Sequence, residues 1–271
     1  VSHDFWDRFL VVIQLGAILA VGVLFFYQLN PFSPSKGKDG RKATWRLWGQ
    51  ILVDCLPAAI IGVPLDDWME EHLGSPFVIA AALIVYGIAF IAIESHREHK
   101  AKRLADEQAA EGHAKHFAVR TFEDFDAPSE LADADAAVQD GKGMPWKTAF
   151  GIGCFQVLSM VPGTSRSGAT IIGGLLLGGS RAVPAEFTFY LAIPVMVGAS
   201  GLRLVKFFLK GNSFTTTEAQ VLGVGCIVAF VVSLLAIRFL MSFVKKHDFK
   251  PFGWYRIILG ALVIAYFVLV A

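Results

Sequence analysis

Charged residues are scarce in this sequence, and neither sign is in excess. They make up 17% of the 271 residues, and the net charge is +1, whereas about a quarter of the residues of a soluble domain are charged. This balance argues against nucleic acid or any other partner held by bulk charge.

Cysteine is also rare, and the start of the chain lacks two features of a signal peptide. Cys55, Cys154 and Cys226 lie far apart, which fits neither a disulfide framework nor a metal site, so we interpret them as small core-filling side chains. No basic region precedes the apolar block that begins at Phe9 and no small-residue cleavage site follows it, so this block is expected to remain as a membrane helix.

Long apolar blocks dominate the rest of the sequence. Hydrophobic residues make up 55% of it, and they gather in blocks long enough to cross about 30 Å of hydrocarbon as helices. The clear candidates are residues 9–28, 77–93, 187–208, 219–244 and 252–271, and a weaker one, 49–65, is interrupted by Asp54 and Pro57. The predicted fold class is an all-α, polytopic membrane protein, with one membrane domain over residues 1–271.

Basic residues near the span ends predict the orientation. Loop 30–48 carries five Lys or Arg, whereas loop 66–75 has four acids and neither Lys nor Arg. We expect 30–48 and 94–146 in the cytoplasm and 66–75 outside, and within 94–146 the polar stretch 98–143 is expected to be a flexible loop, helical at its start. Since Lys245, Lys246 and Lys250 place the last loop inside as well, residues 147–181 should begin and end in the cytoplasm.

Residues 147–181 therefore suit a re-entrant helical hairpin. Their apolar arms, 148–161 and 168–178, are each too short to span, and the polar string PGTSRSGAT lies between them at 162–170. Such backbone is tolerated in a membrane only where protein buries it or it lines a wet cavity. Residues 9–20 resemble 187–198 in apolar pattern, and by the charge rule they run in opposite directions, which favours an inverted-topology repeat.

The polar tip of this hairpin is the best candidate site. An arginine in the bilayer interior costs at least about 2.5–3.5 kcal/mol, so Arg166 needs an anion or a water-filled pocket. A helix from Gly168 would point free N–H groups at the tip. The surrounding hydroxyls and the flexible glycine are those of Thr164, Ser165, Ser167, Thr170 and Gly163. We favour a phosphate or oxyanion site; in the alternative, the hydroxyls only cap the helix and Arg166 snorkels or pairs with a carboxylate.

These residues carry a family resemblance. PGTSRSGAT, with GCFQ at 153–156 before it and EFTFYLAIP at 186–194 after it, resembles the second signature of the bacterial undecaprenyl-diphosphate phosphatases of the BacA type. The resemblance runs from 9–20 to PFGWYR at 251–256. It implies hydrolysis of the terminal phosphate of undecaprenyl diphosphate, recycling of the lipid carrier for cell-wall synthesis and bacitracin resistance. It further implies a bacterial inner-membrane protein whose site faces the periplasm.

The resemblance also implies residue roles. Arg166 and Ser165 are expected to be catalytic, with Arg166 neutralising charge that develops in phosphoryl transfer. Ser165 and Thr170 would hold phosphate oxygens. Supporting substrate contacts are expected from Ser167, Gly163 and Thr164. Gln156 either faces the site or is an ordinary buried amide.

One part of the family pattern does not occur in this chain. The first signature, with two glutamates four apart, a PVSS-type turn and a histidine, supplies the ligands of a divalent cation, Mg²⁺ or Ca²⁺. The repeat places it before Val1, so no metal ligand is assigned here, and the chain as written is expected to turn diphosphate over poorly. Asp54 has no role in the family pattern and is expected to bond to a neighbouring helix.

Two other functions stay open at this point. A transporter or flippase of an anionic lipid or small anion is the alternative, because inverted repeats and broken helices are also a transporter's architecture. The other is a catalytically inactive remnant with a structural role. The expected partners are a polyprenyl diphosphate lipid and the bilayer, without nucleic acid, and the oligomeric state is open, a homodimer included.

Overall fold

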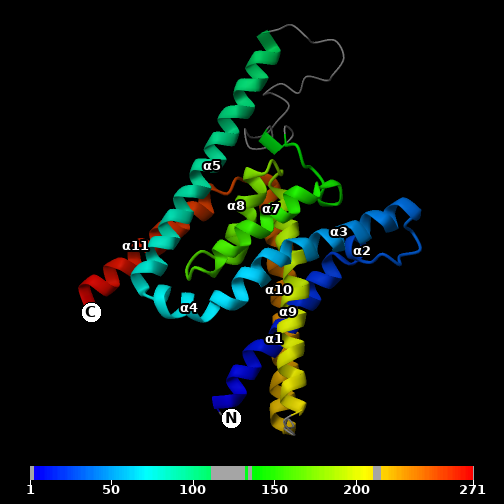
Figure 1. Cartoon of the computed structure of the whole chain (residues 1–271), viewed down its shortest axis with the longest axis vertical. Helices are drawn as coiled ribbons and strands as arrows, with labels where there is room; N and C mark the ends of the chain where they lie inside the picture. Colours follow the sequence, from blue (N-terminus) through cyan, green and yellow to red (C-terminus); the bar gives the residue numbers. More distant parts are fainter. Residues whose placement is uncertain (1–2, 111–131, 134–135, 210–214, 271) are drawn as a thin grey trace. The chain divides into compact units, whose positions relative to one another are not determined.

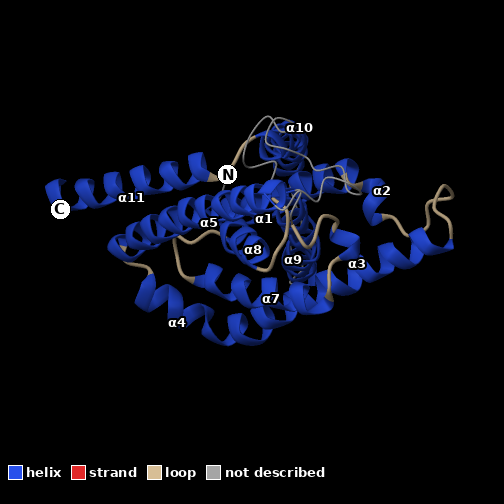
Figure 2. Cartoon of the chain, turned by 90° about the horizontal axis from the view of Figure 1, so that it is seen from above, coloured by secondary structure: helices blue, strands red, loops and turns tan. Residues whose placement is uncertain are grey.

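The structure is a computed structural model and describes residues 3–110, 132–133, 136–209 and 215–270. Helices account for nearly all regular structure in these residues (Figures 1 and 2). Their one strand-like pairing is an isolated bridge between Val138 and Gly179. The all-α class is confirmed. The chain divides into two compact units, residues 1–51 with 189–242 and residues 52–188 with 243–271; one membrane domain over residues 1–271 stays a prediction.

The first unit is built around aromatic and small-residue contacts. The ring of Phe25 packs edge-on against Tyr190, with centroids 5.1 Å apart. Gly16 lies so close to the backbone of Cys226 that a Cβ would clash with its carbonyl. The helices of this unit are α1 (His3–Leu24), α2 (Phe26–Leu29), most of α3 (Lys38–Pro57), the later part of α9 (Ala182–Leu209) and most of α10 (Thr216–Lys246).

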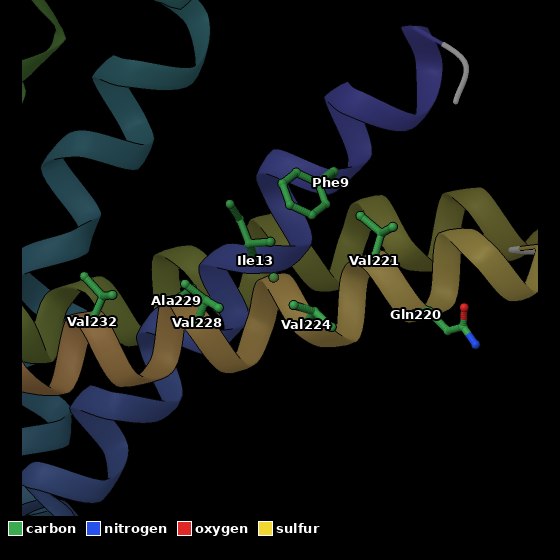
Figure 3. Close-up of a pocket in the computed structure, with 9 residues that line it drawn as sticks. Phe9, Ile13, Gln220, Val221, Val224, Val228, Ala229 and Val232 are labelled. Atoms are coloured by element: carbon green, nitrogen blue, oxygen red, sulfur yellow. The ribbon is translucent and has the colours of Figure 1, made fainter.

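An apolar groove of about 650 Å³ runs between α1 and α10. Figure 3 shows Phe9 and Ile13 of α1 opposite valines of α10, Val224 and Val228 among them. Its lining is apolar except for Gln220, as expected for helices that face lipid.

The second unit contains the predicted hairpin. Its elements are the end of α3, a π-helical turn (Ala58–Gly62), α4 (Val63–Leu73), α5 (Pro76–Ala110), a 3₁₀ turn (Gly141–Gly143), α7 (Trp146–Val157), a second 3₁₀ turn (Leu158–Met160), α8 (Arg166–Leu176), the start of α9, the end of α10 and α11 (Lys250–Val270). Helices α7 and α8 pack against each other through Phe155 and Gly173, where a Cβ on the glycine would lie 2.7 Å from that of Phe155.

Glycines also bring α5 and α11 together; the two helices cross in Figure 1 and lie next to each other in Figure 2. A Cβ on Gly87 would lie 2.6 Å from the carbonyl oxygen of Gly253, and one on Gly253 would lie 2.7 Å from that of Gly87. Small residues at such crossings let backbones approach closely, which is the usual way that membrane helices associate.

Four helices in the described residues are long and apolar enough to cross a membrane: Pro76–Arg103, Ala182–Leu202, Thr216–Lys246 and Lys250–Leu269. They overlap the predicted spans at 77–93, 187–208, 219–244 and 252–271, although most of their ends differ by several residues, and residue 271 lies outside the described residues. The protein is a multi-pass membrane protein.

Two predicted spans are interrupted in the structure. The first, 9–28, is divided at Phe25 between α1, which ends at Leu24, and the short helix α2, although helical hydrogen bonds such as that from the N–H of Phe25 to the carbonyl of Val21 continue across the break. Pro31 disfavours helical backbone at Asn30, where α2 ends. The second, 49–65, is no continuous α-helix, because α3 ends at Pro57 and a π-helical turn follows. Proline lacks an N–H group and its ring opens the preceding helical turn.

The stretch 98–143 is only partly the loop expected from its composition. Helix α5 continues to Ala110, which confirms the helical start, and residues 136–143 include the Val138–Gly179 bridge and a 3₁₀ turn. Residues 111–131 and 134–135 lie outside the described residues.

Candidate functional site

The turn between α7 and α8 depends on one glycine and one buried threonine. Gly163 has a φ of +95°, and a Cβ there would lie 2.6 Å from the carbonyl oxygen of Ile79 on α5, so only glycine suits both the conformation and the contact. The hydroxyl of Thr164 is buried and bonds the carbonyls of Val161, at 2.7 Å, and Leu158, at 3.0 Å. Thr164 therefore shapes the tip from inside, and its predicted contact with substrate stays a prediction.

Ser165 caps α8 in a strained conformation. It is the one non-glycine residue with positive φ, +66°, in the described part of the chain, and such backbone costs on the order of 1–3 kcal/mol. Its hydroxyl accepts a long hydrogen bond of 3.4 Å from the N–H of Gly168 and lies 3.1 Å from the hydroxyl of Ser167. The helix thus begins at Arg166, two residues before the predicted start, with both serine side chains exposed.

Arg166 occupies the first position of α8 with an open guanidinium. Its side chain is exposed, and the hydrogen bonds and ion pairs between described residues do not engage it. The first N–H groups of a helix have no intrahelical acceptor, and its dipole favours an anion there. Arginine fork, two hydroxyls and helix N-terminus therefore meet at the exposed tip, which can bind a phosphate group.

Thr170 and Gln156 lie deeper than the tip. Thr170 is fully buried. Its hydroxyl lies 2.8 Å from the hydroxyl of Thr188, which is in the first part of α9, and donates to the carbonyls of Arg166 and Ser167, both at 3.1 Å. It braces α8, so the role expected for it at phosphate stays a prediction. Gln156 is buried on α7, and its Oε1 has no hydrogen-bond partner in the described residues.

Asp54 is fully buried at the end of α3, and its backbone packs against Gly153 of α7. Neither carboxylate oxygen has a hydrogen-bond partner among the described residues, so the expected bond to a neighbouring helix is wrong there. Arg256 was not predicted to have an individual role, although a charge inside an apolar span is a signal in itself. Arg256 of α11 donates from Nη1 to the carbonyl of Thr164 at 3.1 Å.

A second charged cluster lies at the other end of α8, and no sequence pattern pointed to it. Asp133 accepts hydrogen bonds from the backbone N–H and the Nε of Arg181, both at 2.7 Å, and from Nη2 of Arg97 at 3.1 Å. Arg181 is fully buried, and Glu94 lies 3.8 Å from it. Because removing one partner would leave a buried charge uncompensated, we interpret this cluster as a structural clamp on the base of the hairpin.

Comparison with known proteins decides the family. Residues 2–262 match the family described as bacitracin resistance protein BacA. The chain belongs to the BacA family. A relative from Lactiplantibacillus plantarum named undecaprenyl-diphosphatase is 48% identical over 269 residues, which cover 99% of this chain and 86% of that protein. A relative of the same name from Enterococcus faecalis is 47% identical over 98% of this chain and 84% of its own length. Another, from Streptococcus thermophilus, is 48% identical over 98% of this chain and 80% of its own length.

The BacA assignment confirms the resemblance expected from PGTSRSGAT. The exposed tip at Arg166 lies within the residues that match the BacA family. The roles of the individual tip residues stay predictions.

Proposed function

We propose that this BacA-family protein hydrolyses undecaprenyl diphosphate to undecaprenyl phosphate and inorganic phosphate, and so recycles the lipid carrier of cell-wall synthesis. Water supplies the oxygen that becomes bonded to the terminal phosphorus, and the bond from that phosphorus to the bridging oxygen breaks. The names of the relatives and the chemistry of the hairpin tip support this reaction.

The observation that carries the proposal is the open guanidinium of Arg166 at the start of α8. A guanidinium can bind two phosphate oxygens at once, and it stabilises the charge that builds on them in the transition state. The hydroxyls of Ser165 and Ser167 lie 3.1 Å apart on the same turn and can donate to the remaining oxygens. The free N–H groups of the first turn add fixed donors that cost no reorganisation.

A divalent cation belongs to the proposal as a requirement to be tested. The described residues contain no group of three or more His, Cys, Asp or Glu side chains that could hold one, so these residues do not fit it and no step is assigned to it. Activity should disappear on treatment with EDTA and return with Mg²⁺ or Ca²⁺. Activity that survives exhaustive chelation would remove the requirement.

We further propose that the tip faces the periplasm from the bacterial inner membrane. The charge pattern supports this orientation: 30–48 is rich in Lys and Arg and 66–75 has neither. Access from the outer face would bring the site to lipid carrier that has delivered its cargo outside.

The decisive experiment measures phosphate release from undecaprenyl diphosphate by the purified protein in detergent. Arg166→Ala should lower kcat/KM by on the order of 10²–10³-fold, because it removes the main charge at the tip. Arg41→Ala, on an exposed part of α3, is the matched control and should behave like the wild type. Wild-type activity in Arg166→Ala would refute the proposal. Movement of labelled lipid across vesicles without phosphate release would favour a transporter instead.

A further inference from the structure

Arg256 approaches the hairpin tip from α11. It follows Gly253 by one helical turn, and at Gly253 the backbone of α11 packs closely against that of Gly87 on α5. One turn after Gly87 on α5 stands Phe90, whose ring centroid lies 5.7 Å from Cζ of Arg256. The glycine contact and the aromatic ring together fix where this guanidinium lies.

Two nitrogens of the Arg256 guanidinium contact the hairpin tip. Nη1 donates to the carbonyl oxygen of Thr164 at 3.1 Å. Nη2 lies against Gly168, where an added Cβ would be 3.0 Å from it. Arg256 therefore contacts the residue before the strained Ser165 and the third residue of α8.

The bond to Thr164 fixes the direction of the next N–H group. The carbonyl of Thr164 and the N–H of Ser165 belong to one planar, trans peptide unit, so they point in opposite directions. A donor that holds the carbonyl also holds that unit, and with it the positive φ of Ser165. The orientation of the tip is thus set by a side chain from another helix.

The positive charge of Arg256 lies where the electrostatic field of α8 disfavours a cation and favours a bound anion. Gly168 is in the first turn of α8, where the helix dipole repels cations and attracts anions. Arg166 adds a second positive charge, and no carboxylate of the described residues forms an ion pair with either arginine. Two guanidinium groups and a helix N-terminus, with no ion pair to a carboxylate of the described residues, make the tip a favourable place for an oxyanion.

From this geometry we infer that Arg256 is a positioning residue of the tip, holding the Thr164–Ser165 peptide so that Arg166 and the first-turn N–H groups can receive the terminal phosphate. The inference rests on the proposed function for its substrate. Arg256 acts through the backbone that it holds and adds its charge to the tip.

Two substitutions test the inference from opposite sides. Arg256→Gln removes the charge and should lower kcat/KM for undecaprenyl diphosphate by on the order of 10- to 100-fold, because the tip loses its alignment. Gly168→Ala adds a methyl group against Nη2 and should lower it by about tenfold, although alanine in a helix favours folding. Arg256→Lys, which keeps the charge and one donor nitrogen, should recover part of the rate. Tyr255→Phe, at the exposed neighbouring position of α11, is the matched control.

The melting temperature separates positioning from general damage. Gly168→Ala should keep or raise it while losing activity, a result that a purely structural role cannot produce. Wild-type kcat/KM in both Gly168→Ala and Arg256→Gln would overturn the inference and leave the proposed function intact.

Binding of inorganic diphosphate gives a readout independent of turnover, followed as a rise in melting temperature. Arg256→Gln should weaken this binding about tenfold or more. If the wild type releases no phosphate, the proposed function fails, and this binding measurement still decides the role of Arg256. Unchanged diphosphate binding in Arg256→Gln would then refute it.

Discussion

Single residues at the hairpin tip combine strain with exposure. Gly163 and Ser165 both have positive φ, and only the glycine adopts it without cost. The serine keeps an exposed hydroxyl at the helix start. Strain of this kind persists where the surroundings enforce it, and it is concentrated at functional sites.

Replacing Ser165 by glycine should separate strain from function. Ser165→Gly relieves the positive φ and loses little as a helix cap, so its melting temperature should equal or exceed that of the wild type. Phosphate release should still fall, by on the order of tenfold or more, because the hydroxyl proposed to donate to the phosphate is gone. A variant with full activity would show that the hydroxyl is dispensable and that only the backbone matters.

Asp133 is expected to matter for stability alone. Asp133→Asn removes the charge that compensates the fully buried Arg181, and breaking such a pair costs about 3–5 kcal/mol. The expected result is a lower thermal midpoint in detergent, with KM unchanged in the protein that stays folded. Asp39→Asn, exposed near the start of α3, serves as the control. An unaltered midpoint for Asp133→Asn would mean that Glu94 alone satisfies the arginine.

At the scale of elements, the sequence predicted helices better than the contacts between them. Block lengths located four spans and the hairpin, because the hydrocarbon thickness fixes helix length. The break at Phe25 and the π-helical turn after Pro57 depended on local backbone chemistry that average hydropathy does not register. Arg256, Thr188 and Asp133 reach their partners only after helices pack, so no local pattern could reveal those pairs.

The crossing of α5 and α11 can be tested through its glycines. Gly253→Val would force side-chain atoms into the carbonyl of Gly87, and such overpacking typically costs about 1–3 kcal/mol. A lower melting temperature and a smaller monodisperse peak in size-exclusion chromatography are expected. Gly223→Val on α10, where nothing lies within 4 Å of an added Cβ, should be tolerated. Equal behaviour of the two variants would contradict close packing at Gly253.

For the whole molecule, the family could be recognised from the sequence because one short string is specific to it. The structure adds three features that the string alone does not show: the strained backbone of Ser165, the exposed side chain of Arg166 and the hydrogen bond from Arg256 to the tip. Sidedness depends on flanking charge and on the bilayer, so it needs an experiment in cells.

Labelling with an impermeant maleimide should establish the sidedness. In a variant whose native cysteines are alanine, Gly74→Cys should react in intact bacterial cells, and Ser35→Cys should react only after permeabilisation. Both positions are exposed, so accessibility within the fold does not bias the comparison. The reverse pattern would invert the proposed orientation and put the tip out of reach of the periplasm.

The tip of the hairpin is fastened to the α5–α11 pair at two points, the backbone of Ile79 against Gly163 and Arg256 against Thr164. Both helices are long, apolar and largely uncovered, and helices of this kind tilt when acyl chains are shorter or longer than they are. Turnover in reconstituted bilayers should therefore peak at one acyl-chain length and decline on either side. The thickness of the surrounding membrane would then control the rate of the enzyme.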